Sequence, residues 1–418
     1  MKRFITIVAL SLTYVVFAML LNSVAPVILQ SMLTFGVDKV ATSTLDACKD
    51  IPIALTSIVV ASYLPRLGYR RAMILGLLAV GLGCWCMPLL ASFWATRLTF
   101  VIVGASFAVI KVAVYSSIGL VTAGPKEHAS VTSIIEGLFM VGVLMTSWIF
   151  SAFINPANPG DPVWLRVYWL LGALAFAAAL MWSFVPFDEA RIAVDFERSR
   201  WGRDVRQMMQ LCWQPLVAIF LVCAFVYVLI EQAVQTWLPT FNNEVVGLSA
   251  ALSVQLASVY SASLAAGRLG AGVLLRIVRW PTLLTSCLVG AGALLILSLQ
   301  GGQATALGVS SWSAIPPRAL LLPLIGLFLA PVYPTICSAM LSALPIRQHA
   351  PMTGLIIVFS ALGGTIGSFI TGRVFSATDG RTAFAMAIVP MVLLLVLLRL
   401  FDLRLRTRLA AGPGATPA

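Results

Sequence analysis

The chain has 418 residues, of which 60% are hydrophobic and 10% are charged, and its formal net charge is +12. A soluble globular protein carries about 25% charged residues, so this composition excludes a soluble chain and indicates a protein that crosses a membrane many times. The excess of Lys and Arg needs no nucleic acid to explain it, because membrane proteins concentrate these residues in their cytoplasmic loops.

A helix of about 20 mainly apolar residues spans a bilayer, and the sequence contains twelve stretches of that kind. They cover, in chain order, 5–28, 41–64, 72–92, 95–121, 130–153, 166–186, 214–238, 250–275, 282–299, 319–342, 352–372 and 382–400. The apolar run behind Lys2 and Arg3 is too long for a signal peptide, so we expect it to remain as the first helix. The sequence thus predicts an all-α membrane protein with twelve transmembrane helices.

Basic residues are distributed unevenly over the loops and the span ends. If the N-terminus is inside the cell, eighteen of them lie on the cytoplasmic side and six on the opposite side. Because positively charged loops stay on the cytoplasmic side, we expect both termini there and the protein in the inner membrane of the cell.

A polar stretch after the sixth span separates six spans from six. We therefore expect an N-terminal six-helix bundle at 1–187, a cytoplasmic linker at 188–212, a C-terminal six-helix bundle at 213–403 and a cytoplasmic tail at 404–418. Short repeats relate the two halves, since His128-Ala129-x-x-Thr132 recurs as His349-Ala350-x-x-Thr353 and the same offset places Gly142 on Gly363. These matches predict two pseudo-symmetric bundles.

The loop after the second span reads Arg66-Leu67-Gly68-Tyr69-Arg70-Arg71, and its counterpart in the second half reads Arg276-Ile277-Val278-Arg279. The Arg-x-Gly-x-Arg-Arg core resembles the loop signature of the major facilitator superfamily, with Pro65 in place of the usual acidic residue and Ala61 in place of the usual glycine. Gly68 suits a tight turn, and Arg66, Arg70 and Arg71 suit anchors of the helix ends at the cytoplasmic face.

Two further pieces, Gly267-Arg268 and the segment 326–335, resemble the fucose, galactose and gluconate proton symporters of that superfamily. The superfamily resemblance covers the whole chain. It implies a major facilitator fold in which the first, fourth, seventh and tenth spans surround a central cavity. The second, fifth, eighth and eleventh spans then form the seam between the two bundles.

Ionisable residues lie deep inside five of the spans. They are Asp46, Lys49, Asp50, Lys111, Glu136, Glu231 and Arg268. A charge at the middle of the bilayer costs about 2.5–3.5 kcal/mol on insertion scales, so these spans should face a protein interior or a wet cavity. All five are spans that the resemblance places at the cavity or at the seam.

Asp46, Lys49 and Asp50 share one face of their helix, so Lys49 is expected to pair with an acid on its own helix. This group is either a salt-bridged gate or a proton or cation site.

Lys111 and Glu136 could pair across neighbouring helices, either as a fixed buried pair or as a switch. In the switch, protonation of Glu136 would release Lys111 to bind an anionic group.

Glu231 has no obvious basic partner in the second half of the chain, which makes it the first candidate for a proton carrier, ahead of Asp46, Asp50 and Glu136. Lys111 and four further polar or aromatic residues are candidate substrate ligands, namely Gln232, Gln235, Trp237 and Tyr333. Arg268 could be a structural anchor or a ligand. Pro331 and Pro334 should break their helix, as a fixed kink or as a flexible point.

The sequence shows no nucleotide-binding loop, no His/Cys metal set and no nucleophile with a plausible base, so we expect neither an enzyme nor a bound cofactor or metal. The prediction is a monomeric secondary active transporter that works by alternating access. Its partners would be a small-molecule substrate, a coupling ion, expected to be H⁺, and the lipid bilayer. We expect import of a small polar or anionic solute. The alternatives are export of an amphiphilic compound or drug, and a receptor without flux.

Overall fold

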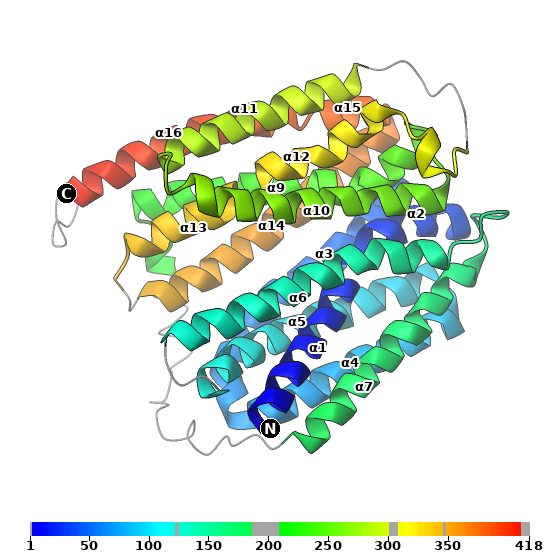
Figure 1. Cartoon of the computed structure of the whole chain (residues 1–418), viewed down its shortest axis with the longest axis horizontal. Coiled ribbons are helices and arrows are strands. Elements are labelled where there is room, and N and C mark those ends of the chain that lie inside the picture. The colour runs from blue at the N-terminus through cyan, green and yellow to red at the C-terminus, as the bar shows by residue number, and fades with distance from the viewer. Residues whose placement is uncertain (1, 122–124, 186–208, 301–307, 346–347, 411–418) are drawn as a thin grey trace. The chain divides into compact units, whose positions relative to one another are not determined.

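Figure 1 shows the computed structural model, which describes residues 2–121, 125–185, 209–300, 308–345 and 348–410. The first half contains α1 (Lys2–Asn22), α2 (Val24–Phe35), α3 (Lys39–Leu67), α4 (Tyr69–Leu90), α5 (Phe93–Val121), α6 (Pro125–Ala152), η1 (Pro162–Arg166) and α7 (Val167–Phe184). The second half contains α9 (Pro215–Glu244), α10 (Ala250–Leu274), α11 (Trp280–Leu299), η2 (Trp312–Ala314), η3 (Pro317–Leu320), α12 (Leu321–Leu329), α13 (Val332–Ser342), α14 (His349–Ala377), α15 (Gly380–Ala385) and α16 (Ile388–Ala410).

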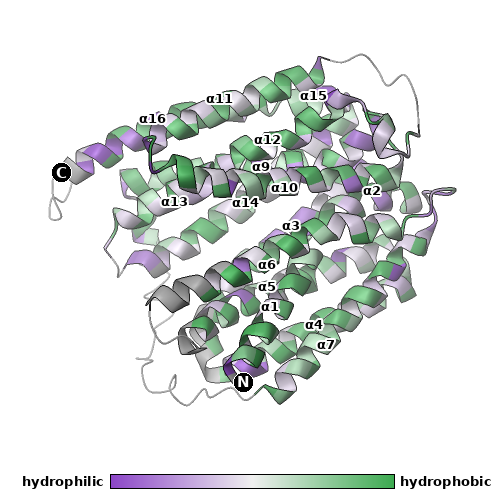
Figure 2. Ribbon diagram, viewed as in Figure 1, coloured by the Kyte–Doolittle hydropathy of each residue, from purple (hydrophilic) through white to green (hydrophobic). Residues whose placement is uncertain are grey.

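The nearly all-helical membrane fold predicted from the sequence is confirmed. Eleven helical segments of the described residues are long and apolar enough to cross a membrane. The remaining predicted span is α3, which has 29 residues and carries four charged residues in its first half, namely Lys39, Asp46, Lys49 and Asp50. Figure 2 shows hydrophobic residues along most of the length of the helices.

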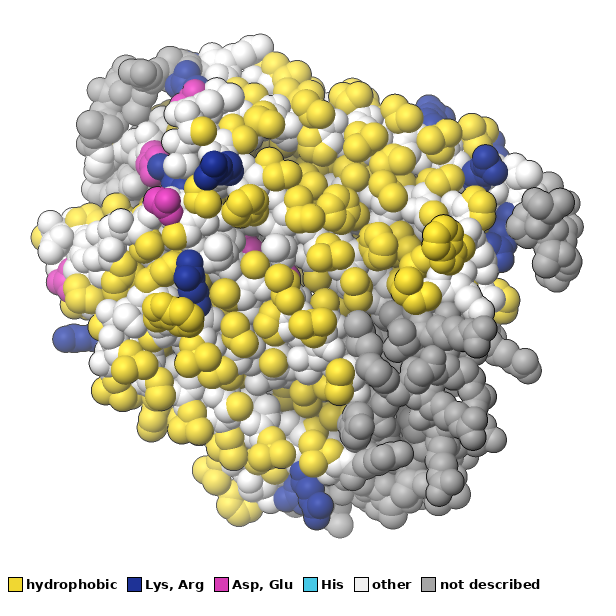
Figure 3. Space-filling view, turned by 180° about the vertical axis from the view of Figure 1, so that it is seen from behind, with side chains coloured by type: hydrophobic (Ala, Val, Ile, Leu, Met, Phe, Trp, Pro, Cys, Tyr) yellow, Lys and Arg dark blue, Asp and Glu magenta, His cyan; other side chains and the backbone are white. Residues whose placement is uncertain are grey.

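Large hydrophobic side chains are exposed on the surface of the protein. Trp94 and Phe184, for example, are 76% and 78% exposed. On the face shown in Figure 3, hydrophobic side chains predominate and Lys and Arg are few. An apolar surface of this kind is suited to contact with lipid chains rather than with water.

Three of the predicted spans are each divided into two helices. The divisions lie between α1 and α2, between α12 and α13, and between α15 and α16. A proline follows each division, and Pro26, Pro334 and Pro390 stand four residues after Asn22, Ala330 and Met386. Because a proline lacks the N–H for the helical hydrogen bond and clashes with the carbonyl four residues before it, the helix is interrupted there.

The chain forms two compact units. The first unit contains residues 1–199 together with 236–258 and 306–314, so it includes the end of α9, the start of α10 and η2. The second unit contains residues 200–235, 259–305 and 315–418. The predicted linker at 188–212 lies mostly outside the described residues, and the predicted tail begins inside α16.

Glycines allow close helix contacts in both units. In the first unit a Cβ at Gly142 of α6 would lie 2.9 Å from the Val15 carbonyl oxygen of α1. In the second unit a Cβ at Gly363 of α14 would lie 2.3 Å from the Phe225 carbonyl oxygen of α9. The two glycines occupy matching positions in the sequence repeat, so the repeat corresponds to the same kind of helix contact in each half.

Candidate functional site

In the first unit, Glu136 of α6 lies in a cluster of aromatic residues from α1 and α5. The Tyr115 hydroxyl donates a hydrogen bond to the Glu136 carboxylate. The Tyr14 ring, which is only 2% exposed, lies edge-on to Tyr115 at a centroid distance of 6.3 Å and is 4.8 Å from the Phe139 ring. The carboxylate is therefore held by a hydroxyl within a mainly aromatic environment.

Lys111 belongs to the same cluster but does not contact Glu136. Its Nζ atom lies over the Phe107 ring, 5.8 Å from the centroid. The Lys111 and Glu136 charges act on each other through space, yet no ion pair of 4.0 Å or less joins Lys111 to any described residue. Tyr115 lies one helical turn after Lys111 on α5. It contacts the Glu136 carboxylate, where the sequence had suggested Lys111 as the partner.

The charged residues of α3 form a compact group in the first unit. The Lys49 Nζ atom lies 3.2 Å from Asp46 Oδ1 and 3.4 Å from Asp50 Oδ1, so the expected pairing on one helix is present. Asp46 is fully buried, and its Oδ2 atom accepts a hydrogen bond of 2.9 Å from the Thr236 hydroxyl of α9. The sequence analysis missed Thr236, because this contact depends on how α9 packs against α3.

Other polar contacts fix residues 236–258 and 306–314 within the first unit. Lys39 forms an ion pair of 3.0 Å with Glu244 at the end of α9. The Trp312 indole donates a hydrogen bond of 2.9 Å to Gln255, whose amide donates one of 3.1 Å to Ser151 of α6. The rings of Trp312 and Trp148 are stacked, with centroids 5.8 Å apart.

In the second unit, Glu231 of α9 has both a hydroxyl and a cation beside it. The Tyr227 hydroxyl donates a hydrogen bond of 3.0 Å to Glu231 Oε1, and the Arg268 Nη2 atom of α10 lies 4.0 Å from the same oxygen. The expectation that Glu231 has no basic partner is therefore wrong. Arg268 reaches it from the next helix, a contact that spacing along one helix does not reveal.

Tyr227 also connects this carboxylate to α13. Its ring stacks on the Tyr333 ring with centroids 5.6 Å apart, and the hydroxyl groups of Tyr333 and Ser360 are 2.9 Å apart. Each unit thus contains a glutamate that accepts a hydrogen bond from a tyrosine and has a cationic side chain nearby.

The remaining predicted residues differ in their accessibility. Trp237 is 0% exposed, so its indole packs against other side chains of the protein. Gln232 and Gln235 are half-buried. Pro331 and Pro334 lie at the division between α12 and α13.

The loop residues that resemble the superfamily signature lie between α3 and α4. Gly68 has a φ of +85° in this turn, a conformation that glycine adopts without strain. Arg70 donates hydrogen bonds to the carbonyl oxygens of Trp182, at 2.9 Å, and Ser183, at the end of α7. Arg71 is exposed, and the Arg66 side chain lies outside the described residues.

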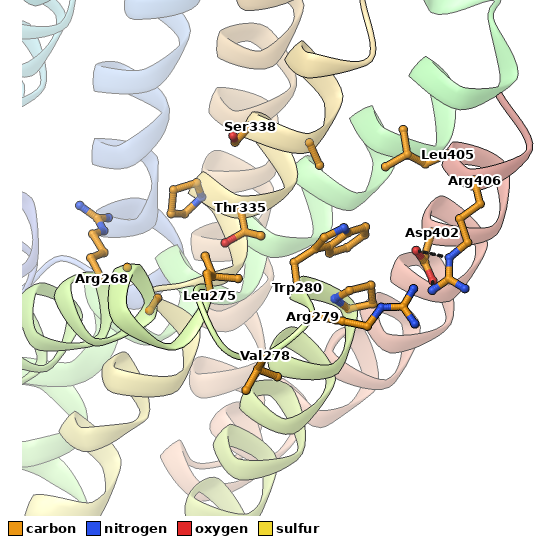
Figure 4. A pocket seen from close by; sticks show the side chains of 15 residues that line it. Arg268, Leu275, Val278, Arg279, Trp280, Thr335, Ser338, Asp402, Leu405 and Arg406 are labelled. Atoms are coloured by element: carbon orange, nitrogen blue, oxygen red, sulfur yellow. Dashed lines mark hydrogen bonds and ion pairs between the residues drawn. The ribbon is translucent and has the colours of Figure 1, made fainter. Parts of the chain in front are cut away.

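An open pocket of about 760 Å³ lies in the second unit, where α10 ends and α11 begins (Figure 4). Residues of α13 and α16 complete its wall. Asp402 and Arg406 of α16 form a two-pronged pair at the pocket, with distances of 2.9 Å and 2.6 Å. Of the residues around this pocket, Arg268 and Pro334 were candidate site residues from the sequence, and Val278 and Arg279 belong to the loop that matches the one after α3.

Among the described residues there is no group of three or more His, Cys, Asp or Glu side chains that could hold a metal ion.

Comparisons with known proteins place this helical arrangement among transporters. A family model described as Major Facilitator Superfamily matches residues 10–322. A search of curated proteins gave no match.

Several solved structures share the fold of this chain. The Escherichia coli fucose:proton symporter FucP is 16% identical with a TM-score of 0.61, over 96% of this chain and 99% of that chain. A bacterial homologue of the human lysosomal transporter Spinster is 17% identical with a TM-score of 0.71, over 99% and 98%. The nucleoside transporter NupG is 13% identical with a TM-score of 0.73, over 96% and 99%.

Proposed function

Because the chain belongs to the major facilitator superfamily, we propose that it imports a small polar or anionic organic solute together with protons by alternating access. Membership of this family makes the chain a membrane transporter and not an enzyme. The excess of basic residues in alternate loops supports an orientation with both termini in the cytoplasm.

The observation that carries the proposal is the arrangement of Lys111 and Glu136. The two charges lie in one cluster, but the carboxylate is bonded to Tyr115 and the ammonium lies over Phe107. Lys111 is half-buried and has no contacting counter-charge among the described residues, which is costly within a membrane span. It therefore attracts an anionic group that enters the cluster.

Proton binding at Glu136 would strengthen this attraction. A protonated Glu136 no longer offers a negative charge to Lys111, so an anionic substrate can take that place. A proton and a monoanion bound together leave the net charge of the cluster unchanged. The loaded and the empty states then carry the same net charge across the membrane. Binding of the proton and binding of the anionic solute therefore favour each other.

Glu231 is the corresponding candidate in the second unit. Arg268 is 4.0 Å away and its side chain is 46% exposed, so this pair is looser than the Lys49 pairs on α3. Asp46 is less suited to release a proton during transport because both of its oxygens have partners. We therefore propose Glu231 and Glu136 as proton carriers, and Asp46, Lys49 and Asp50 as gating residues.

Polar substrates are favoured over amphiphilic ones by the side chains in the two clusters. Lys111 is the proposed ligand of an anionic solute in the first unit. Within the second unit, considered by itself, Gln232, Gln235 and Tyr333 are the polar candidates for ligands. Structural neighbours are described as a fucose:proton symporter, a nucleoside transporter and a peptide transporter, and all three names denote polar solutes.

The experiment is solute uptake into proteoliposomes. Fucose, galactose and gluconate are offered in labelled form, with and without an imposed proton gradient that is acidic outside. We expect accumulation of gluconate, the anionic member of the set, above its external concentration, and loss of this accumulation when a protonophore is added. Accumulation that ignores the gradient would contradict proton coupling, and outward transport of an amphiphilic dye would favour export.

A further inference from the structure

The pocket in Figure 4 combines cationic groups with an apolar wall. Among the described residues that line it, the cations are Arg268, Arg279 and Arg406, and Asp402 is the one acid. Asp402 is 94% buried and is neutralised by Arg406, which contacts both of its oxygens. The pocket is therefore left with the positive charge of Arg279, while Arg268 also lies 4.0 Å from Glu231.

Arg279 is the side chain in this pocket with unused hydrogen-bond donors. The guanidinium has five N–H donors and no acceptor, and no described residue forms an ion pair or a hydrogen bond with it. In Figure 4 it extends toward the Asp402–Arg406 pair. Two guanidinium groups from different helices thus border the same part of the pocket.

The start of α11 adds a further positive element to the pocket. Arg279 is the N-cap residue of this 20-residue helix, and its side chain makes no capping hydrogen bond. The Trp280 and Thr282 N–H groups of the first turn therefore lack a side-chain acceptor, while Pro281 has no N–H. A helix N-terminus of this kind, next to unused arginine donors, favours an anion.

An arginine in the matching loop of the first unit has a different environment. Arg70 follows the loop after α3 and donates its hydrogen bonds to the last carbonyl oxygens of α7. In the second unit α16 continues to Ala410, so the helix does not end beside the loop after α10. Arg279 consequently has no helix end to bind, and it faces the pocket instead.

The rest of the wall is apolar. Leu275, Val278 and Leu405 contribute aliphatic surface, and the Trp280 ring is fixed against Phe401 at a centroid distance of 5.9 Å. A free phosphate ion would use only the arginines of such a pocket. A molecule with both a phosphate and a hydrocarbon chain would use the arginines and the apolar wall together.

We propose that this pocket binds an anionic phospholipid, with its phosphate between Arg279 and Arg406 and an acyl chain along the apolar wall. The half-buried Trp280 and the exposed Arg279 at this end of the helices are residue types typical of the level of lipid headgroups. Basic pockets between the cytoplasmic ends of membrane helices are suited to anionic headgroups. The proposal is independent of the transported solute and of proton coupling.

The test uses purified full-length protein in detergent. Phosphatidylglycerol, phosphatidylcholine with the same acyl chains, and inorganic phosphate are each titrated, and bound lipid is counted by native mass spectrometry. Thermal unfolding is followed in parallel. We expect phosphatidylglycerol to bind and stabilise the protein more strongly than the other two ligands.

Three variants locate the site. Arg279→Gln should weaken phosphatidylglycerol binding about fivefold, the effect of one basic residue near a lipid headgroup. Arg276→Gln is the matched control, because Arg276 is an exposed residue of the same loop outside the pocket wall and its replacement should leave binding unchanged. Arg279→Lys keeps the charge and should retain most of the binding.

Three results would overturn the proposal. Equal binding of phosphatidylcholine and phosphatidylglycerol would show that the charge is not recognised. An equal loss in the Arg276→Gln and Arg279→Gln variants would show a diffuse surface effect. Stabilisation by inorganic phosphate as strong as that by phosphatidylglycerol, and lost in Arg279→Gln, would identify a soluble phosphate as the ligand.

Discussion

The Tyr115 hydroxyl donates a hydrogen bond to the Glu136 carboxylate, whereas the Lys111 Nζ atom lies over the Phe107 ring. A tyrosine hydroxyl can donate to a carboxylate and can also accept from a protonated carboxyl group. The same contact is therefore compatible with both protonation states of Glu136. The lysine, in turn, is left available to a negatively charged ligand.

Lys111→Met should make the protein more stable and prevent binding of an anionic solute. The substitution removes a buried charge that has no ion pair and inserts an apolar side chain of similar length. We expect the melting temperature to rise by about 2–4 °C, the equivalent of about 1 kcal/mol. Thermal unfolding with and without gluconate measures both effects, and Lys111→Arg serves as the control that keeps the charge. A lower melting temperature for Lys111→Met would show that the ammonium is stabilised by a partner.

Glu231→Gln should abolish solute accumulation driven by a proton gradient and leave exchange of labelled solute across the membrane intact. The amide keeps the hydrogen bond from Tyr227 but cannot carry a proton. Uptake and counterflow in proteoliposomes measure the two activities. Glu244→Gln, which removes the acid that pairs with Lys39 at 3.0 Å, should leave the dependence on the gradient unchanged. Unaltered accumulation by Glu231→Gln would transfer the role to Glu136 or to the α3 acids.

Thr236→Val should destabilise the protein by about 1–3 kcal/mol, because it removes a hydrogen-bond donor from the fully buried Asp46. The valine has nearly the same shape, so the effect reports the hydroxyl. Thr240 is an ideal comparison, since its hydroxyl is also buried on α9 but has no hydrogen-bond partner among the described residues. Thr240→Val should be neutral or stabilising. Equal melting temperatures for the two variants would refute the Asp46 contact.

Gly104→Ala should be destabilising by about 1–3 kcal/mol, because it forces two helices apart. A Cβ atom at this position of α5 would lie 2.2 Å from the Lys49 carbonyl oxygen of α3. Gly137 of α6 has no atom within 4 Å of such a Cβ, so Gly137→Ala should be tolerated and should favour the helix. Thermal unfolding of both variants tests the contact, and a stable Gly104→Ala protein would contradict it.

Labelling of single cysteines tests the membrane orientation. Cysteines at Gly202 and Ala418, two positions outside the described residues, should react only after the membrane is made permeable, because the basic loops predict a cytoplasmic location for both. Reaction of either cysteine in intact cells would exclude the predicted orientation.

The sequence was sufficient for the spans and for the pairing of the halves, because both depend on local properties. Long apolar runs identify helices in lipid, and the Gly142 and Gly363 match predicts a repeat that the helix contacts reproduce. The helix divisions before Pro26, Pro334 and Pro390 follow from the same local chemistry. The sequence did not predict which residues of other helices contact the buried charges. Arg268 reaches Glu231, and Thr236 reaches Asp46, through the rotation and register of packed helices, which single-helix spacing does not encode.

Proton uptake on solute binding tests proton coupling most directly. Gluconate, or another solute that accumulates in the uptake experiment, is added to purified protein in a weakly buffered solution containing a pH indicator. We predict that the wild-type protein takes up protons as it binds the solute, and that Glu136→Gln takes up fewer because its cluster can no longer be protonated. Solute binding by the wild-type protein without any proton uptake would contradict the proposed coupling.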